Sequence, residues 1–362
     1  ITEECAEQAF HTDICPIYQM PAYHHLLLDK LCWGKDKALY QFAKQMVDIN
    51  TFDLIFCSSY YYFPLYAAHL LAQEYHIPLA IDLRDIAEQW GDTVYFTRQL
   101  TPFKKLNYWI GKIYERKQLR VRNRILRSAN IVTSVSPWHQ NILAKYNANT
   151  HLIYNGYDAN VFVPKDLMCD YFYITYLGKL YSTQLRDPRM LFEALKQLTS
   201  EEKIDSKHVR VLFHTDPNGM QQLQELGEYY QIAPLLNING YIPRQAILPV
   251  MYQSSILLVL TTLSTPTGTH GIMGTKFFEN IGIEKPILCV RSDEECLADA
   301  IQKTNAGLAA TSVEEVKTFI MEKYQEWLQN GFTRQAVVNK EQFSRQKQAQ
   351  QFEQLFIETL KH

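Results

Sequence analysis

Several common signatures are absent from this sequence. Its seven cysteines are scattered and none forms a Cys-x-x-Cys pair, so zinc and redox motifs are not indicated. No run of about eighteen apolar residues occurs, so no transmembrane helix is expected within it. The formal net charge is only −2, which does not suggest a nucleic-acid-binding protein. The chain also lacks an initiator Met and begins with ITEECAEQAF, so we expect residues upstream of it to be missing.

A further absence concerns cofactors. Rossmann-like sheets often bind NAD, but no Gly-x-Gly-x-x-Gly sequence follows an early strand in this chain. The main sequence support for a dehydrogenase is therefore missing, and we expect no cofactor.

What the sequence does contain is a large apolar fraction, 47% of 362 residues, arranged in short β-rich runs that alternate with helical stretches. Strands are expected at residues 53–58, 78–82, 131–135 and 152–154, and then at 173–177, 209–214, 235–238, 256–260 and 286–290. Continuous apolar strands separated by helices indicate parallel sheets covered on both faces. The predicted fold class is α/β, with two Rossmann-like parallel-sheet domains and a cleft between them.

A polar joint near residues 157–170 separates the two series of strands. We expect an N-terminal domain over residues 1–160, truncated at its start, and a second domain over 161–337. A last helix near 338–360 is expected to pack back on the first domain, so that residues 338–362 form a third unit.

The segment from 265 to 290, TPTGTHGIMGTKFFENIGIEKPILCV, is the most informative. Its loop holds three glycines, Gly268, Gly271 and Gly274, before a helix that Thr275 can cap. A helix N-terminus presents unpaired N–H groups to anions. Lys276 and Glu279 share one helix face, where a carboxylate can accept hydrogen bonds from a ribose diol. The segment suits a nucleotide diphosphate, but an ordinary strand–loop–helix joint is an equal alternative.

The segment from 176 to 195, YLGKLYSTQLRDPRMLFEAL, contains two cations after a strand. Gly178 ends the strand, and Lys179 and Arg186 precede a helix that is expected to begin at Asp187–Pro188. Cations at this edge of a sheet can clamp a diphosphate and neutralise the charge that develops on a leaving group. Taken alone, solvated loop side chains are the simpler interpretation.

Together these segments resemble the C-terminal domain of GT-B glycosyltransferases, specifically the large retaining family 4. NGYDANVF at 155–162 is similar to the family's Asn-Gly-Val-Asp run at the interdomain joint. IDLRD at 81–85 resembles the D-x-R-D that ends an N-domain strand, and NGYIPRQAILPVMYQSSILLVL at 239–260 resembles the run that precedes the donor loop. GTKFFENIGIEKPILCV resembles the helix that carries the second Glu of the family's E-x7-E pattern. The resemblance covers residues 50–310.

The resemblance implies a role for each matching residue. Glu279 would bind the donor ribose, Lys179 and Arg186 would act on the diphosphate, and Asp82 would face the reacting sugar. The other donor-binding positions that it implies are Gly178, Ile242, Arg244, His270, Gly271, Gly274, Thr275 and Lys276. The first Glu of E-x7-E falls at Gly271, and transferases of capsule and lipopolysaccharide pathways with a G-T-K-x-x-E version are the most similar.

The activity implied is retaining transfer of a hexose from a nucleotide-diphosphate sugar to a saccharide or lipid-linked saccharide acceptor, in cell-surface polysaccharide synthesis. No D-x-D motif is present, which fits metal-independent catalysis. Two alternatives stay open. Gly271 in place of a Glu favours a nucleotide-sugar binder with weak or no activity. A UDP-sugar 2-epimerase shares the fold, although the acid/base motifs it needs are not found.

One segment, residues 95–127, is strongly basic and aromatic. Its basic residues are Arg98, Lys104, Lys105, Lys112, Arg116, Lys117, Arg120, Arg122, Arg124 and Arg127, opposed only by Glu115. Trp109 and other apolar residues interleave with them, a pattern that suits an anionic bilayer surface. We therefore expect a cytoplasmic protein that can lie on the membrane face near its acceptor. A helix packed on its sheet with a solvated basic face is the alternative, and RNA binding is a weaker one.

Overall fold

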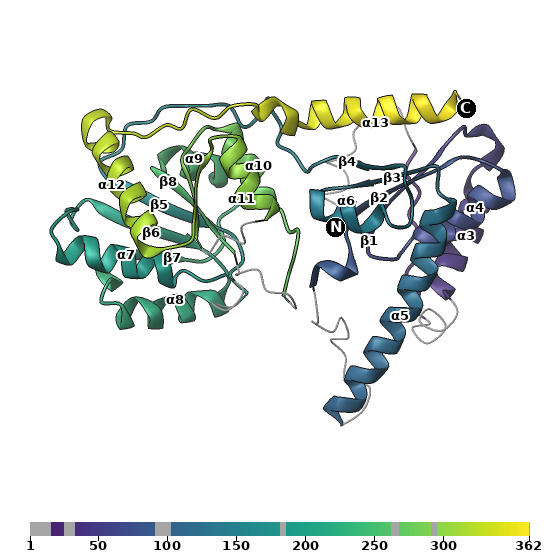
Figure 1. Ribbon diagram of the computed structural model, residues 1–362, viewed down its shortest axis with the longest axis horizontal. Coiled ribbons are helices and arrows are strands. Elements are labelled where there is room, and N and C mark those ends of the chain that lie inside the picture. The colour runs from purple at the N-terminus through teal and green to yellow at the C-terminus, as the bar shows by residue number, and fades with distance from the viewer. Residues whose placement is uncertain are drawn as a thin grey trace.

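The structure is a computed structural model that describes residues 16–24, 33–90, 103–181, 186–261, 268–290 and 295–361. Within these ranges the strands form two separate, entirely parallel sheets, one in each half of the molecule (Figure 1). The α/β architecture with two Rossmann-like sheets is therefore confirmed.

The N-terminal sheet has the strand order β1-β2-β3-β4. Its strands are β1 (Ile55–Tyr60), β2 (Leu79–Asp85), β3 (Ile131–Ser134) and β4 (Thr150–Leu152). Its helices are α3 (Gly34–Met46), α4 (Leu65–Tyr75), α5 (Lys104–Ser128) and α6 (Pro137–Leu143). The central strand β2 begins with the run LAIDL, which is buried on both faces as a strand inside a parallel sheet must be.

The C-terminal sheet has the order β7-β6-β5-β8-β9-β10, which is the doubly wound Rossmann order. Its strands are β5 (Phe172–Leu177), β6 (Val209–His214), β7 (Leu236–Asn239), β8 (Ile256–Leu260), β9 (Ile287–Val290) and β10 (Gly307–Ala310). Its helices are α7 (Arg189–Ser200), α8 (Pro217–Tyr229), α9 (Arg244–Gln253), α10 (Thr275–Gly282), α11 (Cys296–Lys303) and α12 (Val313–Asn330). β5 pairs with β6 on one side and β8 on the other, so the chain reverses direction across the sheet at β5.

The final helix, α13 (Arg345–Leu360), runs from the C-terminal half to the N-terminal half (Figure 1). At its start, backbone hydrogen bonds join Tyr157 to Phe343 and Arg345. Further along, the rings of Phe352 and Phe356 contact Phe56 of β1 at centroid distances of 5.4 and 5.2 Å. The last segment therefore contacts both domains.

Three local expectations need correction. The cap position of α10 belongs to Gly274, and Thr275 is already the first helical residue. The cap position of α7 is Pro188, one residue later than expected, and the Asp187 carboxylate accepts from the backbone N–H and guanidinium of Arg189. The last helix is interrupted, since the short 3-10 helix η4 (Lys340–Phe343) precedes a new helix start that Ser344 caps.

Candidate active site

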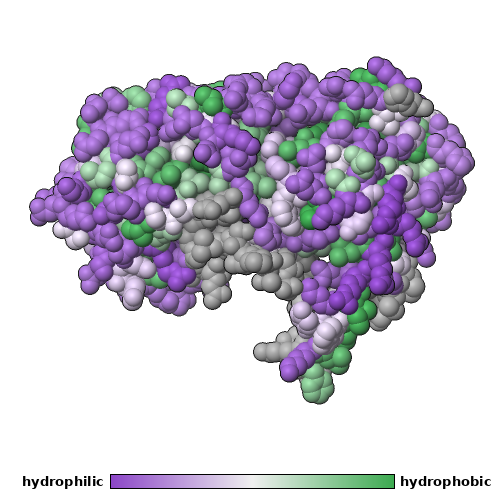
Figure 2. Space-filling view, in the orientation of Figure 1, coloured by the Kyte–Doolittle hydropathy of each residue, from purple (hydrophilic) through white to green (hydrophobic). Residues whose placement is uncertain are grey.

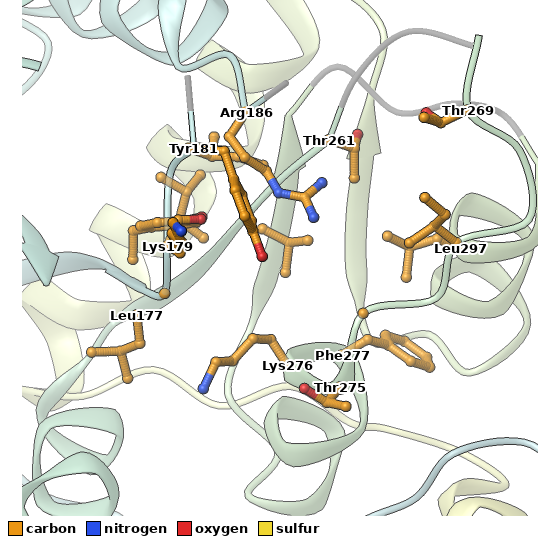
Figure 3. Close-up of a pocket in the computed structure, with 17 residues that line it drawn as sticks. Leu177, Lys179, Tyr181, Arg186, Thr261, Thr269, Thr275, Lys276, Phe277 and Leu297 are labelled. Atoms are coloured by element: carbon orange, nitrogen blue, oxygen red, sulfur yellow. The ribbon is translucent and has the colours of Figure 1, made fainter. Parts of the chain in front are cut away.

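A cavity of about 220 Å³ lies where β5 and β8 end in the C-terminal domain. The crevice outside the carboxyl ends of strands, at the reversal of strand order, is where doubly wound folds bind ligands. Lys179, Tyr181 and Arg186 come from the segment after β5, whereas Thr275 and Lys276 come from the first turn of α10 (Figure 3). The two motifs singled out in the sequence therefore meet at one cavity.

The cations at the cavity differ in their partners. Within the described part of the chain, neither Lys179 nor Arg186 makes a salt bridge, and the Lys179 ammonium lies 4.7 Å from the ring centroid of Tyr181. Lys276, in contrast, lies 3.3 Å from the carboxylate of Glu279 on the same helix face. Burial raises the pKa of Tyr176 to about 12, and the positive charge of Arg186 acts against this rise. The cavity is thus a positively charged site suited to an anion.

The segment that carries Lys179 is held by Asp216, which none of the sequence motifs included. The Asp216 carboxylate accepts from the backbone N–H of Leu180 at 3.0 Å and of Gly219 at 3.1 Å. Burial would raise its pKa, but these N–H groups outweigh the burial and leave the pKa lowered. Asp216 also caps α8 ahead of a proline, and that Asp-Pro start was the available sequence signal.

The remaining donor positions predicted on the C-terminal domain are arranged around the cavity in different ways. The lining residues among them are Gly178, Gly274, Thr275 and Lys276. Glu279 accepts a hydrogen bond from Lys276 but is not a lining residue. Ile242 and Arg244 are not lining residues either, because they lie after β7, two strands away from β5. The structure also adds lining residues that the motifs did not indicate, among them Tyr181, Thr269, Ile272 and Leu297.

Asp82 does not line this cavity; it is buried inside the N-terminal sheet, with 2% of its surface exposed. Its oxygens accept from the hydroxyls of Ser58 and Thr133, and the Arg84 guanidinium lies 3.2 Å away. Burial raises the pKa of Asp82, while Arg84 and the two hydroxyls oppose the rise. Its predicted role opposite the reacting sugar stays a prediction.

His270 and Gly271 join the two domains. The His270 ring stacks on Trp138 of α6 at a centroid distance of 5.5 Å and an angle of 13°. Its backbone N–H donates to the carbonyl of Gln89, next to the end of β2, at 2.9 Å. Gly271 has a φ of +66°, a left-handed conformation that favours glycine. The glycine loop therefore touches the N-terminal domain directly.

Residues 104–127 of the basic segment lie in α5, whose first half projects from the N-terminal domain (Figure 1). Residues 95–102, with Arg98, lie outside the described residues. Apolar residues are exposed along this half, including Trp109 at 58% and Ile113 at 64%, and Figure 2 shows hydrophobic (green) surface beside hydrophilic (purple) surface on the projecting part of the molecule. Lys105 and Arg116 are exposed, Lys112 pairs with Glu115 at 3.3 Å, and the side chain of Lys104 lies outside the described part. The second half packs on the sheet through Ile125 and Leu126. The second half therefore fits the packed-helix interpretation, whereas contact of the first half with a membrane stays a prediction.

Two kinds of feature are absent from the described ranges. These ranges contain no cluster of three His, Cys, Asp or Glu side chains arranged to hold a metal ion. None of their helices combines the length and the apolar character needed to cross a membrane. Independence from metal ions stays a prediction.

Comparison with known proteins supports the resemblance seen in the motifs. Residues 8–161 match the model of the family described as Glycosyltransferase Family 4. No curated protein matches the sequence.

Solved structures resemble the chain over most of its length. Sucrose-phosphate synthase from Thermosynechococcus elongatus has a TM-score of 0.60 at 15% identity, covering 93% of this chain and 80% of that one. A glycosyltransferase from Rickettsia africae has a TM-score of 0.60 at 13% identity, with coverages of 96% and 85%. The pneumococcal O-GlcNAc transferase GtfA follows with 0.55 at 14%, covering 90% and 60%. Such low identities show the fold alone, and the family match covers residues 8–161, less than half of the chain.

Proposed function

We propose that this protein, a glycosyltransferase of the GT-B type, transfers a hexose from a nucleotide-diphosphate sugar to a saccharide or lipid-linked saccharide acceptor. We further propose that transfer retains the anomeric configuration, needs no metal ion and serves cell-surface polysaccharide synthesis.

The observation that carries the proposal is the pair of cations beside the cavity. Lys179 and Arg186 have no carboxylate partner in the part of the chain that the structure describes, although Arg186 is half-buried. A cation held near a partly desolvated site without a counter-ion favours an anionic ligand, because the ligand then supplies the missing charge. The first turn of α10, with its exposed Gly274 and Thr275, faces the same space and adds backbone N–H groups.

The proposed reaction is a displacement on one face of the sugar. The bond between the anomeric carbon and the diphosphate oxygen breaks while the acceptor oxygen forms a bond to the same carbon. The acceptor proton passes to an oxygen of the leaving phosphate, so no dedicated protein base is needed. Lys179 and Arg186 stabilise the charge that develops on the leaving diphosphate.

A UDP sugar is the first donor to test, because the structure of pneumococcal GtfA contains UDP and GlcNAc. The experiment measures thermal unfolding with UDP-, GDP- and dTDP-sugars in the presence of a chelator. We expect one nucleotide to raise the midpoint by binding the folded state. The shift should weaken in Lys179→Ala, Arg186→Ala and Glu279→Ala and persist in Lys196→Ala, which removes an exposed lysine of α7.

Each other result has a definite meaning. No shift with any donor contradicts a nucleotide site at this cavity. A shift without transfer or donor hydrolysis identifies a binding protein, and conversion of the free donor to its 2-epimer identifies an epimerase. A requirement for a divalent ion contradicts metal-independent catalysis.

We also propose that the first half of α5 docks the N-terminal domain on an anionic membrane. Exposed Trp109 and Ile113 lie beside exposed Lys105 and Arg116, and side chains of these two kinds suit the boundary between lipid tails and anionic headgroups. Docking there would bring the protein close to a lipid-linked acceptor.

Vesicle co-sedimentation tests the docking. The wild type should bind vesicles that contain phosphatidylglycerol and bind phosphatidylcholine vesicles weakly. Lys105→Glu should weaken binding about fivefold or more, because each basic residue near the surface contributes about 1 kcal/mol. Trp109→Ser should weaken it as well. The matched controls are Lys203→Glu and Tyr229→Ser, which change exposed residues of the other domain. Equal binding to both lipids would contradict the proposal.

A further inference from the structure

A carboxylate outside every sequence motif holds the glycine loop. Glu295 immediately precedes α11, and one of its oxygens lies 2.7 Å from Nδ1 of His270. Its other oxygen accepts from the backbone N–H of Gly271 at 3.2 Å. Glu295 occupies the cap position of α11, yet its side chain makes no cap hydrogen bond to that helix. The carboxylate is therefore committed to the loop rather than to its own helix.

The contact with Glu295 continues into the N-terminal domain. With Nδ1 directed at Glu295, the His270 ring is held flat against the indole of Trp138. The backbone N–H of His270 is bound to Gln89, whose side-chain amide donates to Asp85 at the end of β2 at 2.8 Å. Glu295 thus lies at one end of a series of contacts that reaches the end of β2 in the N-terminal domain.

The same arrangement explains why position 271 carries no carboxylate. A Cβ on Gly271 would lie 2.9 Å from Trp138 and 3.1 Å from the Ser136 hydroxyl, closer than ordinary contacts allow. The positive φ of Gly271 adds strain for any larger residue. A side chain at 271 is therefore incompatible with the stacked loop, and the carboxylate beside the loop comes from Glu295.

We propose that Glu295 is a positioning residue for sugar transfer. By holding His270 and Gly271, it keeps the glycine loop against Trp138 and so sets the donor domain relative to the N-terminal domain. The kinetic consequences of this proposal rest on the function proposed above. The contact itself can be tested without any measurement of activity.

The contact is tested by amide hydrogen exchange on peptides that cover residues 268–274. Glu295→Ala removes both acceptors, so exchange there should become about tenfold faster, as expected when hydrogen bonds to a charged group are lost. Glu314→Ala, which removes a carboxylate of α12 that is 78% exposed, is the control and should leave the loop unchanged. Unchanged exchange in Glu295→Ala would overturn the proposal whether or not the protein is an active transferase.

The proposal predicts that loss of the Glu295 carboxylate lowers the rate of sugar transfer but leaves the affinity for the nucleotide unchanged. Glu295→Ala should lower kcat about tenfold to a hundredfold, because small displacements of the reacting groups have effects of that size. The Kd for UDP should stay within about twofold, because Lys179, Arg186 and the first turn of α10 are untouched. Glu295→Gln should recover part of the activity, because its amide can pair with both loop groups once His270 changes tautomer.

A double variant tests whether Glu295 acts through the stack. Trp138→Leu removes the aromatic partner and keeps apolar volume in the N-terminal core. If Glu295 acts through Trp138, Glu295→Ala/Trp138→Leu should be no slower than the slower single variant. Independent, multiplying effects would overturn the proposed route, and an unchanged kcat in Glu295→Ala would overturn the positioning role. A wild-type protein that neither binds UDP nor transfers a sugar would instead reject the proposed function. The exchange result would still decide whether the contact between Glu295 and the glycine loop exists.

Discussion

The two domains use charged side chains in different ways. In the N-terminal domain, Arg122 is 1% exposed and forms two hydrogen bonds of 2.7 and 2.6 Å to Glu88, and Asp82 is surrounded by groups that stabilise its charge. In the C-terminal domain, Lys179 and Arg186 stand beside the cavity with no carboxylate partner in the described ranges. The Arg122–Glu88 pair stabilises the N-terminal domain, whereas Lys179 and Arg186 suit an anionic ligand. Substitution of Arg122 should therefore change stability, and substitution of Lys179 or Arg186 should change activity.

The largest expected effect is on stability. Arg122→Ala leaves the Glu88 carboxylate without its cation, and the loss of one partner from a buried ion pair costs about 3–5 kcal/mol. Urea unfolding at neutral pH measures the change. Arg120→Ala, which removes an exposed arginine of the same helix, should change the free energy of unfolding by less than about 0.5 kcal/mol. Similar values for the two variants would show that the buried pair has no special role.

On the other side of the comparison, Lys179→Ala should lower kcat by about a hundredfold to a thousandfold, the usual loss when a group that stabilises transition-state charge is removed. Its unfolding midpoint should not change, because the ammonium has no ion-pair partner within the described ranges to lose. Lys196→Ala is the control for removal of a lysine. A lower unfolding midpoint in Lys179→Ala would show instead that Lys179 stabilises the fold.

A pH-dependent prediction concerns His139. Neither of its ring nitrogens has a hydrogen-bond partner in the described part of the chain, and burial lowers its pKa from 6.5 to about 4. Between these values the unfolded chain binds a proton that the folded protein does not, so stability falls as the pH falls. The loss at pH 4 amounts to about 3 kcal/mol, given about 1.4 kcal/mol for each pKa unit. The free energy of unfolding, measured at several pH values, should depend less on pH in His139→Leu than in the wild type. An equal pH dependence in the two proteins would refute the assignment of this effect to His139.

The smallest effect distinguishes two glycines of one loop. Gly271→Ala should destabilise the protein by about 1–2 kcal/mol, because an alanine is strained in the left-handed backbone conformation. The close approach of the new Cβ to Trp138 adds to this cost. Gly274→Ala should be nearly neutral, because Gly274 has a φ of −64° and a Cβ there meets nothing within 4 Å. Thermal unfolding of both variants measures the difference. Equal midpoints would mean that the stacked loop does not form in solution.

Much of the fold was predictable because its signals are local. Runs such as VRVLFH at β6 and ILLVL at β8 are rich in apolar residues that include the β-branched Val and Ile, and a buried parallel strand needs residues of that kind. The edge strand β10 was not predicted, because GLAA has weak β propensity and is a strand only through its pairing with β9. Glycine loops and helix starts likewise predicted that Lys179 and Lys276 lie where an anion can bind, and both residues line the same cavity.

By itself, the sequence determined the two sheets, the order of their strands along the chain and the motifs that place cations at a strand end. These features depend on residues close together in the chain. Only the tertiary structure decided that Asp82 is buried in its sheet, that Glu295 holds His270 and Gly271, and that Trp138 lies against both. These contacts join segments from 24 residues apart, as in the pair of Gly271 with Glu295, to more than a hundred apart, as in the stack of Trp138 on His270. Such pairs leave no periodic pattern in the sequence, because they form only when segments far apart in the chain fold together.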